Sequence, residues 1–352
     1  MSTLVTPSPA STTPSLSTRP PELEDAVGVL ERHAHNPSAF LTLNAETRRF
    51  RMPGIDGFIA YRPAGRRHFV QLGGVFADDA GKEVLLRGFR AMAGVEGRHL
   101  VTVQLLRDDA ELYAREGFTV NQFGASYGRS LCDFNLRGGA YMRLRNKISR
   151  ARRAGIGVAE VGVDLEASPE LEARLAAIDA QWLRSKGRHI KELAFMVGER
   201  GGPAAGLRRL FIATGEDGDT LGYITFSPVY GRQSGWLHDL SRRTPDAPPG
   251  TMELVIHTAI NRFMAEGVGY LHFGLTPFSG LADSHELPER SPAAKRIVGL
   301  LAAHGKHIYP AADQVAYKEK WGPDLIQPEY AAFSAGVTAG AVWSLLRLTN
   351  AI

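Results

Sequence analysis

The chain has 352 residues, enough for two domains of ordinary size, and its 44% hydrophobic and 22% charged residues are typical of a globular protein. The single cysteine, Cys132, excludes a disulfide framework within the chain and a cysteine-based metal site. We expect it to be a small buried residue in a reducing cytoplasm. The formal net charge is only +4, so a strongly basic segment indicates a local anionic partner rather than a generally cationic surface.

The first twenty residues are rich in Ser, Thr and Pro and carry one charge, so we expect residues 1–20 to be a disordered tail. They lack the basic start and apolar run of a signal peptide. No stretch of the chain reaches the roughly 18–20 apolar residues of a membrane span.

Residues 21–136 are expected to form a first mixed α/β unit. Helical periodicity covers 23–35, 82–94 and 108–116. Runs typical of strands are 40–43, 57–61, 68–72, 99–105, 118–123 and 130–135.

The segment 137–155 predicts a strongly basic helix. Seven of the seventeen residues from Arg137 to Arg153 are Arg or Lys, and none is acidic. Met142, Leu144, Ile148 and Ala151 recur at helical spacing, which indicates one apolar stripe and a broad cationic face. Such a face suits a polyanion or a lipid surface, although a solvated surface helix has the same composition.

Residues 156–330 are expected to form a second α/β unit with a similar rhythm. Helices are predicted from Ser168 to about 186, over 251–266 and over 292–301. Strands are predicted at 157–163, 208–214, 220–228, 234–240 and 270–275, and the short connections favour antiparallel pairing. Residues 331–352 are predicted to be an apolar C-terminal helix that packs on the body or lies on a membrane surface.

Several motifs, in this order, resemble the soluble catalytic domain of the phosphatidylglycerol lysyltransferase family over about residues 40–335. They are Leu144–Gly155, Trp182–Leu183, Glu192–Phe195, Asp239–Arg243, Pro249–Glu253, Phe273–Leu281 and Tyr317–Trp321. The chain departs from the family pattern at Ser241, where a larger apolar residue is usual, and at Glu253, where Asp is commoner.

The resemblance implies two tandem acetyltransferase-like α/β units with mixed, largely antiparallel sheets. It also implies transfer of an aminoacyl group from aminoacyl-tRNA to an acceptor hydroxyl or amine. Members carry a membrane region before this domain, and we expect none here. A small amine or hydroxylamine of a natural-product pathway is therefore kept as an acceptor beside a phosphatidylglycerol-type lipid. We expect a cytoplasmic protein; peripheral contact with the inner face of the membrane through the C-terminal helix is the alternative to packing of that helix on the body.

The resemblance also implies the site. Asp239, at the end of an apolar strand, would bind the substrate ammonium or accept a proton, or would merely pair with Arg242. Arg242 would grip phosphate, and Glu253 would act in catalysis or only complement a helix dipole. Substrate-binding residues would be Gly274, Thr276, Lys318 and Lys320. Contacts to tRNA phosphates would come from Arg143, Arg145, Lys147, Arg150, Arg152 and Arg153.

An aminoacyl ester is already activated, so we expect no metal and no cofactor beyond aminoacyl-tRNA as co-substrate. His33 with His35, and His304 with His307, lack matching carboxylates for a metal site. His238 and His272 are expected to be core or rim histidines. The alternatives are an acyl-CoA N-acyltransferase, against which Arg232–Gly235 lacks the pyrophosphate-loop spacing, and a non-catalytic tRNA- or membrane-binding module.

Overall fold

The computed structural model describes residues 20–186, 195–304 and 311–350. Most of the predicted tail 1–20 and the motif residues 192–194 therefore lie outside the described residues. The helices are α1 (Pro21–His33), η1 (Ala39–Leu43), α2 (Asp79–Val95), α3 (Arg107–Arg115), α4 (Met142–Arg153), α5 (Pro169–Lys186), η2 (Ala205–Leu207), α6 (Thr251–Ala265), η3 (Asp283–His285), α7 (Pro292–His304), α8 (Ala311–Glu319) and α9 (Ala339–Leu348), where η marks a 3₁₀ helix.

Twelve strands form one mixed sheet in the order β1-β2-β3-β5-β12-β6-β11-β10-β9-β8-β7, with β4 paired to β2. The strands are β1 (Arg48–Phe50), β2 (Gly57–Ala64), β3 (His68–Leu72), β4 (Phe76–Ala77), β5 (His99–Leu105), β6 (Thr119–Ser130), β7 (Gly157–Glu160), β8 (Arg209–Thr214), β9 (Thr220–Val229), β10 (Gly235–Arg243), β11 (Tyr270–Pro277) and β12 (Leu325–Phe333). The pairs β3–β5 and β10–β11 are parallel, and the other described pairs are antiparallel. The prediction of a mixed, largely antiparallel α/β fold is confirmed.

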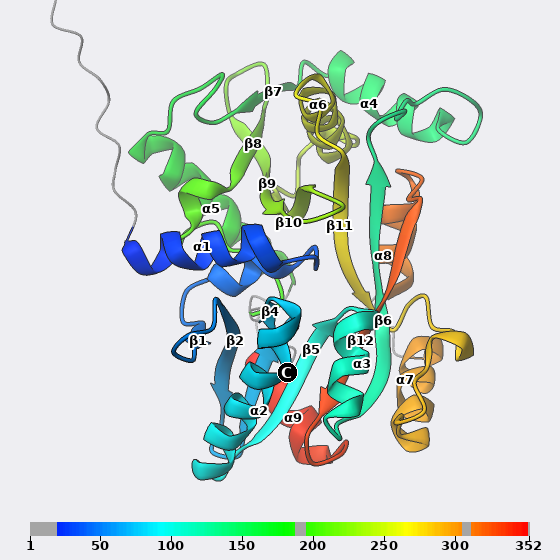
Figure 1. The fold of residues 1–352 in the computed structure, drawn as a ribbon. Coiled ribbons are helices and arrows are strands. Elements are labelled where there is room, and N and C mark those ends of the chain that lie inside the picture. The colour runs from blue at the N-terminus through cyan, green and yellow to red at the C-terminus, as the bar shows by residue number, and fades with distance from the viewer. Residues whose placement is uncertain (1–19, 187–194, 305–310, 351–352) are drawn as a thin grey trace, which may run out of the picture.

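The two halves of the chain share this sheet. Strand β6 pairs with β11 on one side and with β12 on the other, and β12 also pairs with β5. In Figure 1, α2 and α3 lie with the half that contains β5, and α4, α5 and α6 lie with the half that contains β8 to β10. The last strand of the chain therefore returns to the first half and joins the two.

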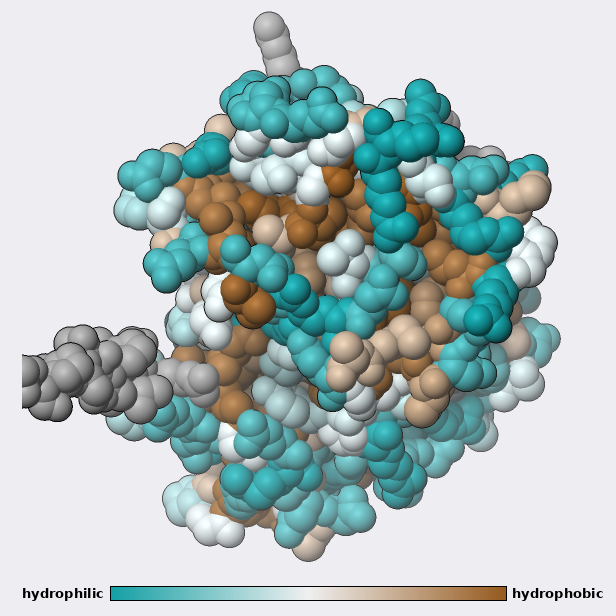
Figure 2. Space-filling view, turned by 90° about the horizontal axis from the view of Figure 1, so that it is seen from above, coloured by the Kyte–Doolittle hydropathy of each residue, from teal (hydrophilic) through white to brown (hydrophobic). Residues whose placement is uncertain are grey.

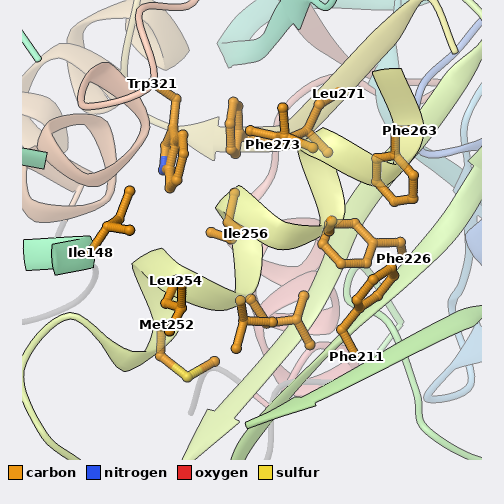
Figure 3. Packing of buried hydrophobic residues seen from close by; sticks show 14 of the residues in the cluster. Ile148, Phe211, Phe226, Met252, Leu254, Ile256, Phe263, Leu271, Phe273 and Trp321 are labelled. Carbon is orange, nitrogen blue, oxygen red and sulfur yellow. The ribbon is translucent and has the colours of Figure 1, made fainter. Parts of the chain in front are cut away.

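Helix α4 is held to the second half by its apolar stripe. Leu144, Ile148 and Ala151 are buried in a core that also contains Ile256 of α6 and Trp321, and Figure 3 shows Ile148, Ile256 and Trp321 together there. Burial of a Leu or Ile side chain contributes about 1.5–3 kcal/mol, so this stripe anchors the basic helix. Met142, the fourth predicted member of the stripe, is 53% exposed and does not belong to it.

Four local predictions are wrong. Residues 40–43 form the 3₁₀ helix η1 rather than a strand, and β6 ends at Ser130, so 130–135 is not a strand. Cys132 is exposed rather than buried. Residues 331–333 complete β12, and the C-terminal helix begins only at Ala339. Among the described residues, no helix has the length and apolar character needed to cross a membrane.

Candidate active site

The parallel strands β10 and β11 part in the middle of the sheet. Their pairing ends at Leu237 and His272. Each strand is irregular just beyond that point: β10 shifts register against β9 between His238 and Leu240, and β11 shifts against β6 between His272 and Gly274. The facing backbone edges beyond this point are not held by a ladder, so polar groups of other elements or of a ligand can reach them.

Lys318 of α8 occupies the β11 side of this opening. Its Nζ donates hydrogen bonds to the carbonyl oxygens of Gly274 and Leu275, at 2.6 and 3.1 Å. Burial lowers the pKa of Lys318 to about 7, although the charge of Glu329 opposes the shift. The structure thus brings two predicted substrate-binding residues, Gly274 and Lys318, into contact. Thr276, two residues further along β11, is fully buried.

His238 lies on the β10 side of the opening among aromatic rings. The centroid of its ring is 5.8 to 6.5 Å from those of Phe226, Phe273 and Tyr317. Burial, helped by the charge of Lys318, lowers the pKa of His238 to about 4. The imidazole is therefore neutral at pH 7.

Asp239 sits at the bulge of β10 with its carboxylate fully enclosed. It accepts hydrogen bonds from Thr225 and Ser227, and Nε of Arg208 approaches it at 3.2 Å. Burial raises the pKa of Asp239, and these three partners oppose the shift. A Cβ at Gly198 would come within 2.5 Å of the carboxylate carbon, so only glycine fits over it. The ion-pair partner of Asp239 is thus Arg208.

Arg242 lies further along β10 and packs against α5. Its guanidinium carbon is 3.8 Å from the centroid of the Trp182 ring, a cation–π contact. The residue is only 8% exposed. Trp182 belongs to a motif of the resemblance, and the contact explains why an aromatic residue stands there.

Glu253 lies between two lysines at the start of α6. Its Oε1 is 3.0 Å from Nζ of Lys147 on α4 and 3.3 Å from Nζ of Lys320. Burial opposes ionisation of Glu253, but both lysines outweigh burial and lower its pKa. Residues predicted separately as tRNA-binding, catalytic and substrate-binding therefore form one cluster of charges.

The basic residues predicted on α4 fall into two groups: some contact other parts of the chain, and the rest are exposed arginines. Lys147 pairs with Glu253, and Arg145 donates to the carbonyls of Leu136 and Gly138. Arg143, Arg150, Arg152 and Arg153 are exposed, and only Arg152 has a polar side-chain contact in the described chain, with His257. Figure 2 looks onto the end of the molecule that carries α4 and α6. Hydrophilic residues (teal) and hydrophobic residues (brown) are interspersed on this face.

Two further residues escaped the sequence analysis. Arg208 follows a 3₁₀ turn, and nothing in its neighbourhood in the sequence points to Asp239. Glu329 is fully buried in β12. The sequence does contain a clue to Glu329, because it is the single acidic residue in the otherwise uncharged run Ile326–Phe333. In the described part of the chain, no group of His, Cys, Asp or Glu side chains could hold a metal ion.

The chain is similar to known proteins over most of its length. A family model described as the C-terminal part of phosphatidylglycerol lysyltransferase matches residues 27–333. The lysylphosphatidylglycerol biosynthesis bifunctional protein LysX of Mycobacterium avium is 25% identical over 224 residues. These cover 64% of this chain but only 18% of LysX, so the chain spans less than a fifth of that relative.

Two solved structures share the fold. L-PGS from Bacillus licheniformis superposes with a TM-score of 0.75 at 20% identity, over 93% of this chain and 96% of the other. The C-terminal domain of a putative lysylphosphatidylglycerol synthetase from Agrobacterium fabrum gives 0.74 at 20% identity, over 94% and 98%. Because the family model covers most of the chain, the protein belongs to the phosphatidylglycerol lysyltransferase C-terminal family, a family of transferases.

Proposed function

We propose that the chain transfers an aminoacyl group from aminoacyl-tRNA to an acceptor hydroxyl or amine. The observation that carries the proposal is the parting of β10 and β11, with the Lys318 side chain held at the carbonyl oxygens of Gly274 and Leu275 on β11. A cation fixed beside a gap between strands suits a reaction in which negative charge develops on a carbonyl oxygen.

The reaction exchanges one ester bond for an ester or amide. The acceptor oxygen or nitrogen bonds to the carbonyl carbon, the bond from that carbon to the tRNA ribose oxygen breaks, and the acceptor proton passes to the ribose oxygen. Lys318 would stabilise the charge on the carbonyl oxygen, with Thr276 beside it. Asp239 would keep Arg208 and β10 in place, and Arg242 would bind phosphate next to Trp182. These roles follow from positioning and electrostatics.

The tRNA would lie across α4. Arg143, Arg150 and Arg153 are exposed and have no hydrogen bond or ion pair with another described residue, so they are available for phosphates. Lys147, Lys320 and Glu253 would fix α4 against the start of α6, near the opening between β10 and β11, rather than bind tRNA themselves.

For the acceptor we favour a phosphatidylglycerol-type lipid, because the relative named above is described by lysylphosphatidylglycerol biosynthesis. Helix α9 exposes Trp343 to 60% and Val342 to 38%, which supports peripheral contact with the inner face of a membrane by a cytoplasmic protein. A small amine or hydroxylamine is the second acceptor class. The acyl-CoA alternative is disfavoured, since residues 232–235 form the turn into β10 and do not open a helix.

The test is discharge of a radiolabelled mixed aminoacyl-tRNA pool by the purified chain, with and without phosphatidylglycerol vesicles. We expect label in the organic phase when vesicles are present. Discharge only with a small amine or hydroxylamine would move the acceptor to that class. A folded protein that discharges no aminoacyl-tRNA would refute the proposal.

A further inference from the structure

Glu329 differs from the other buried carboxylates discussed above because, in the described part of the chain, its polar neighbours are only the Ser126 hydroxyl and the more distant charge of Lys318. It is fully buried, and no donor among the described residues, the nearby Ser126 hydroxyl included, has the geometry of a hydrogen bond to either of its oxygens. By contrast, Asp239 has three partners and Glu253 lies between two lysines. Glu160, also buried, pairs with two arginines. A buried carboxylate without donors is costly, and one in a native structure calls for a specific explanation.

Glu329 lies close to the proposed site. It pairs in register with Gly124 of β6, and Ser126, two residues along the same strand, pairs with Leu275 of β11. The carbonyl of Leu275 is one of the two that receive Lys318. Only one strand, β6, therefore separates Glu329 from the strand that lines the opening.

Lys318 influences the pKa of Glu329 through its charge, but it does not bind the Glu329 carboxylate. Burial raises the pKa of Glu329 to about 7, while the neighbouring Ser126 hydroxyl and the Lys318 charge oppose the shift. The ammonium of Lys318 is hydrogen-bonded to backbone carbonyls and makes no ion pair with the carboxylate. What Glu329 lacks is a set of N–H donors beside its two oxygens.

We propose that Glu329, with Ser126 beside it, is a specificity residue that receives a primary ammonium group of the aminoacyl donor. The inference rests on the proposed function and adds the residue that would recognise the aminoacyl donor. An ammonium supplies three N–H donors, and both the positive charge and the donors match a carboxylate with free acceptors. Two sources share this chemistry: the α-ammonium of every aminoacyl-tRNA and the side-chain ammonium of a lysyl group. Because Glu329 is fully buried, the donor would have to enter where β10 and β11 part.

The experiment compares discharge of lysyl-tRNA, Nα-acetyl-lysyl-tRNA and Nε-acetyl-lysyl-tRNA by the wild type and by Glu329→Gln. A hydrogen bond to a charged group is worth about 1.5–3 kcal/mol, which corresponds to a change of roughly 10- to 150-fold in kcat/KM. We expect the wild type to disfavour one acetylated donor by at least about tenfold. A preference against the Nα-acetylated donor would identify the α-ammonium as the bound group, and a preference against the Nε-acetylated donor would identify the side-chain ammonium. Glu329→Gln should lose that preference, and Glu329→Asp, which keeps the charge, should retain part of it.

Asp109→Asn is the matched control. Asp109 is another carboxylate whose pKa burial raises, to about 6, but it lies on α3 in the first half of the chain. The control should keep the wild-type preference, and thermal melts establish that each variant is folded. If folded Glu329→Gln retains the full preference, or if the wild type shows none, Glu329 has no role in recognition and the inference falls while the proposed function stands. If the wild type discharges no aminoacyl-tRNA at all, both fall together.

Discussion

The exposed arginines of α4 make a quantitative prediction about salt. The triple variant Arg143→Ala, Arg150→Ala, Arg153→Ala removes three charges that point to solvent and have no hydrogen bond or ion pair with another described residue. Lys147 stays in place because it pairs with Glu253. If each arginine neutralises one phosphate, the slope of log K against log salt should become shallower by about 0.7–0.9 per residue, or about 2–3 in total.

Over a fourfold rise in salt, from about 50 to 200 mM, this difference in slope amounts to roughly 20- to 40-fold in affinity. The assay is equilibrium binding of labelled aminoacyl-tRNA across that range. Between those two salt concentrations, the affinity of the wild type should fall by roughly 20- to 40-fold more than that of the triple variant.

A second triple variant serves as the control. Arg48, Arg66 and Arg115 are also exposed, belong to the first half of the chain, and likewise have no hydrogen bond or ion pair with a described residue. Their replacement by alanine changes the net charge equally. Equal slopes for the wild type and the α4 variant would refute the placement of tRNA on α4, and so would an equal effect of the control variant.

Two predictions concern stability. Gly250→Ala and Gly267→Ala both place a side chain at positive φ, at +98° and +75°, but only at Gly250 would the new Cβ lie 2.1 Å from the carbonyl oxygen of Lys147. Gly267→Ala should lower the free energy of unfolding in urea by about 1–2 kcal/mol. Gly250→Ala should lower it by about 1–3 kcal/mol more, because α4 must move. Equal losses would contradict the α4–α6 contact.

The pKa of Glu329 is raised by burial to about 7. Its contribution to stability is therefore present below about pH 4.5 and is lost as the pH rises through about 7. Between pH 5 and 7 the wild type should lose up to about 3 kcal/mol relative to Glu329→Gln, and parallel pH profiles would show that Glu329 is not desolvated.

The sequence predicts well those features that follow from periodicity. The apolar stripe of α4 was visible in the spacing of Leu144, Ile148 and Ala151, and all three are buried. The strands predicted at 208–214, 220–228 and 234–240, from runs separated by turn residues, likewise lie where the structure has β8 to β10. Residues 40–43 misled the prediction, because a short apolar run that is buried on all sides looks the same whether it is a strand or a 3₁₀ helix.

Pairing between distant segments could not be read in the same way. The sequence offered Arg242 as the alternative partner of Asp239, because the two are close in the chain. In the structure Asp239 lies at the bulge of β10 and its carboxylate meets Arg208, thirty-one residues away. Nothing local distinguishes Lys147 from Arg150 on the basic helix either. Both are exposed, and only the approach of α6 gives Lys147 an ion pair, with Glu253, that Arg150 does not have among the described residues.

The charge cluster at Glu253 gives the basic helix a physical link to the opening in the sheet. Lys147 ties α4 to the start of α6 through Glu253, and the same oxygen of Glu253 holds Lys320. Lys320 is two residues from Lys318, whose ammonium lies on the carbonyls of β11. A tRNA bound along the exposed arginines of α4 would therefore rest on a helix whose position is fixed relative to the reacting ester. Since small errors in the placement of an ester cost orders of magnitude in rate, this connection explains why a buried carboxylate and two partly exposed lysines stand together where one apolar contact would have held the helices.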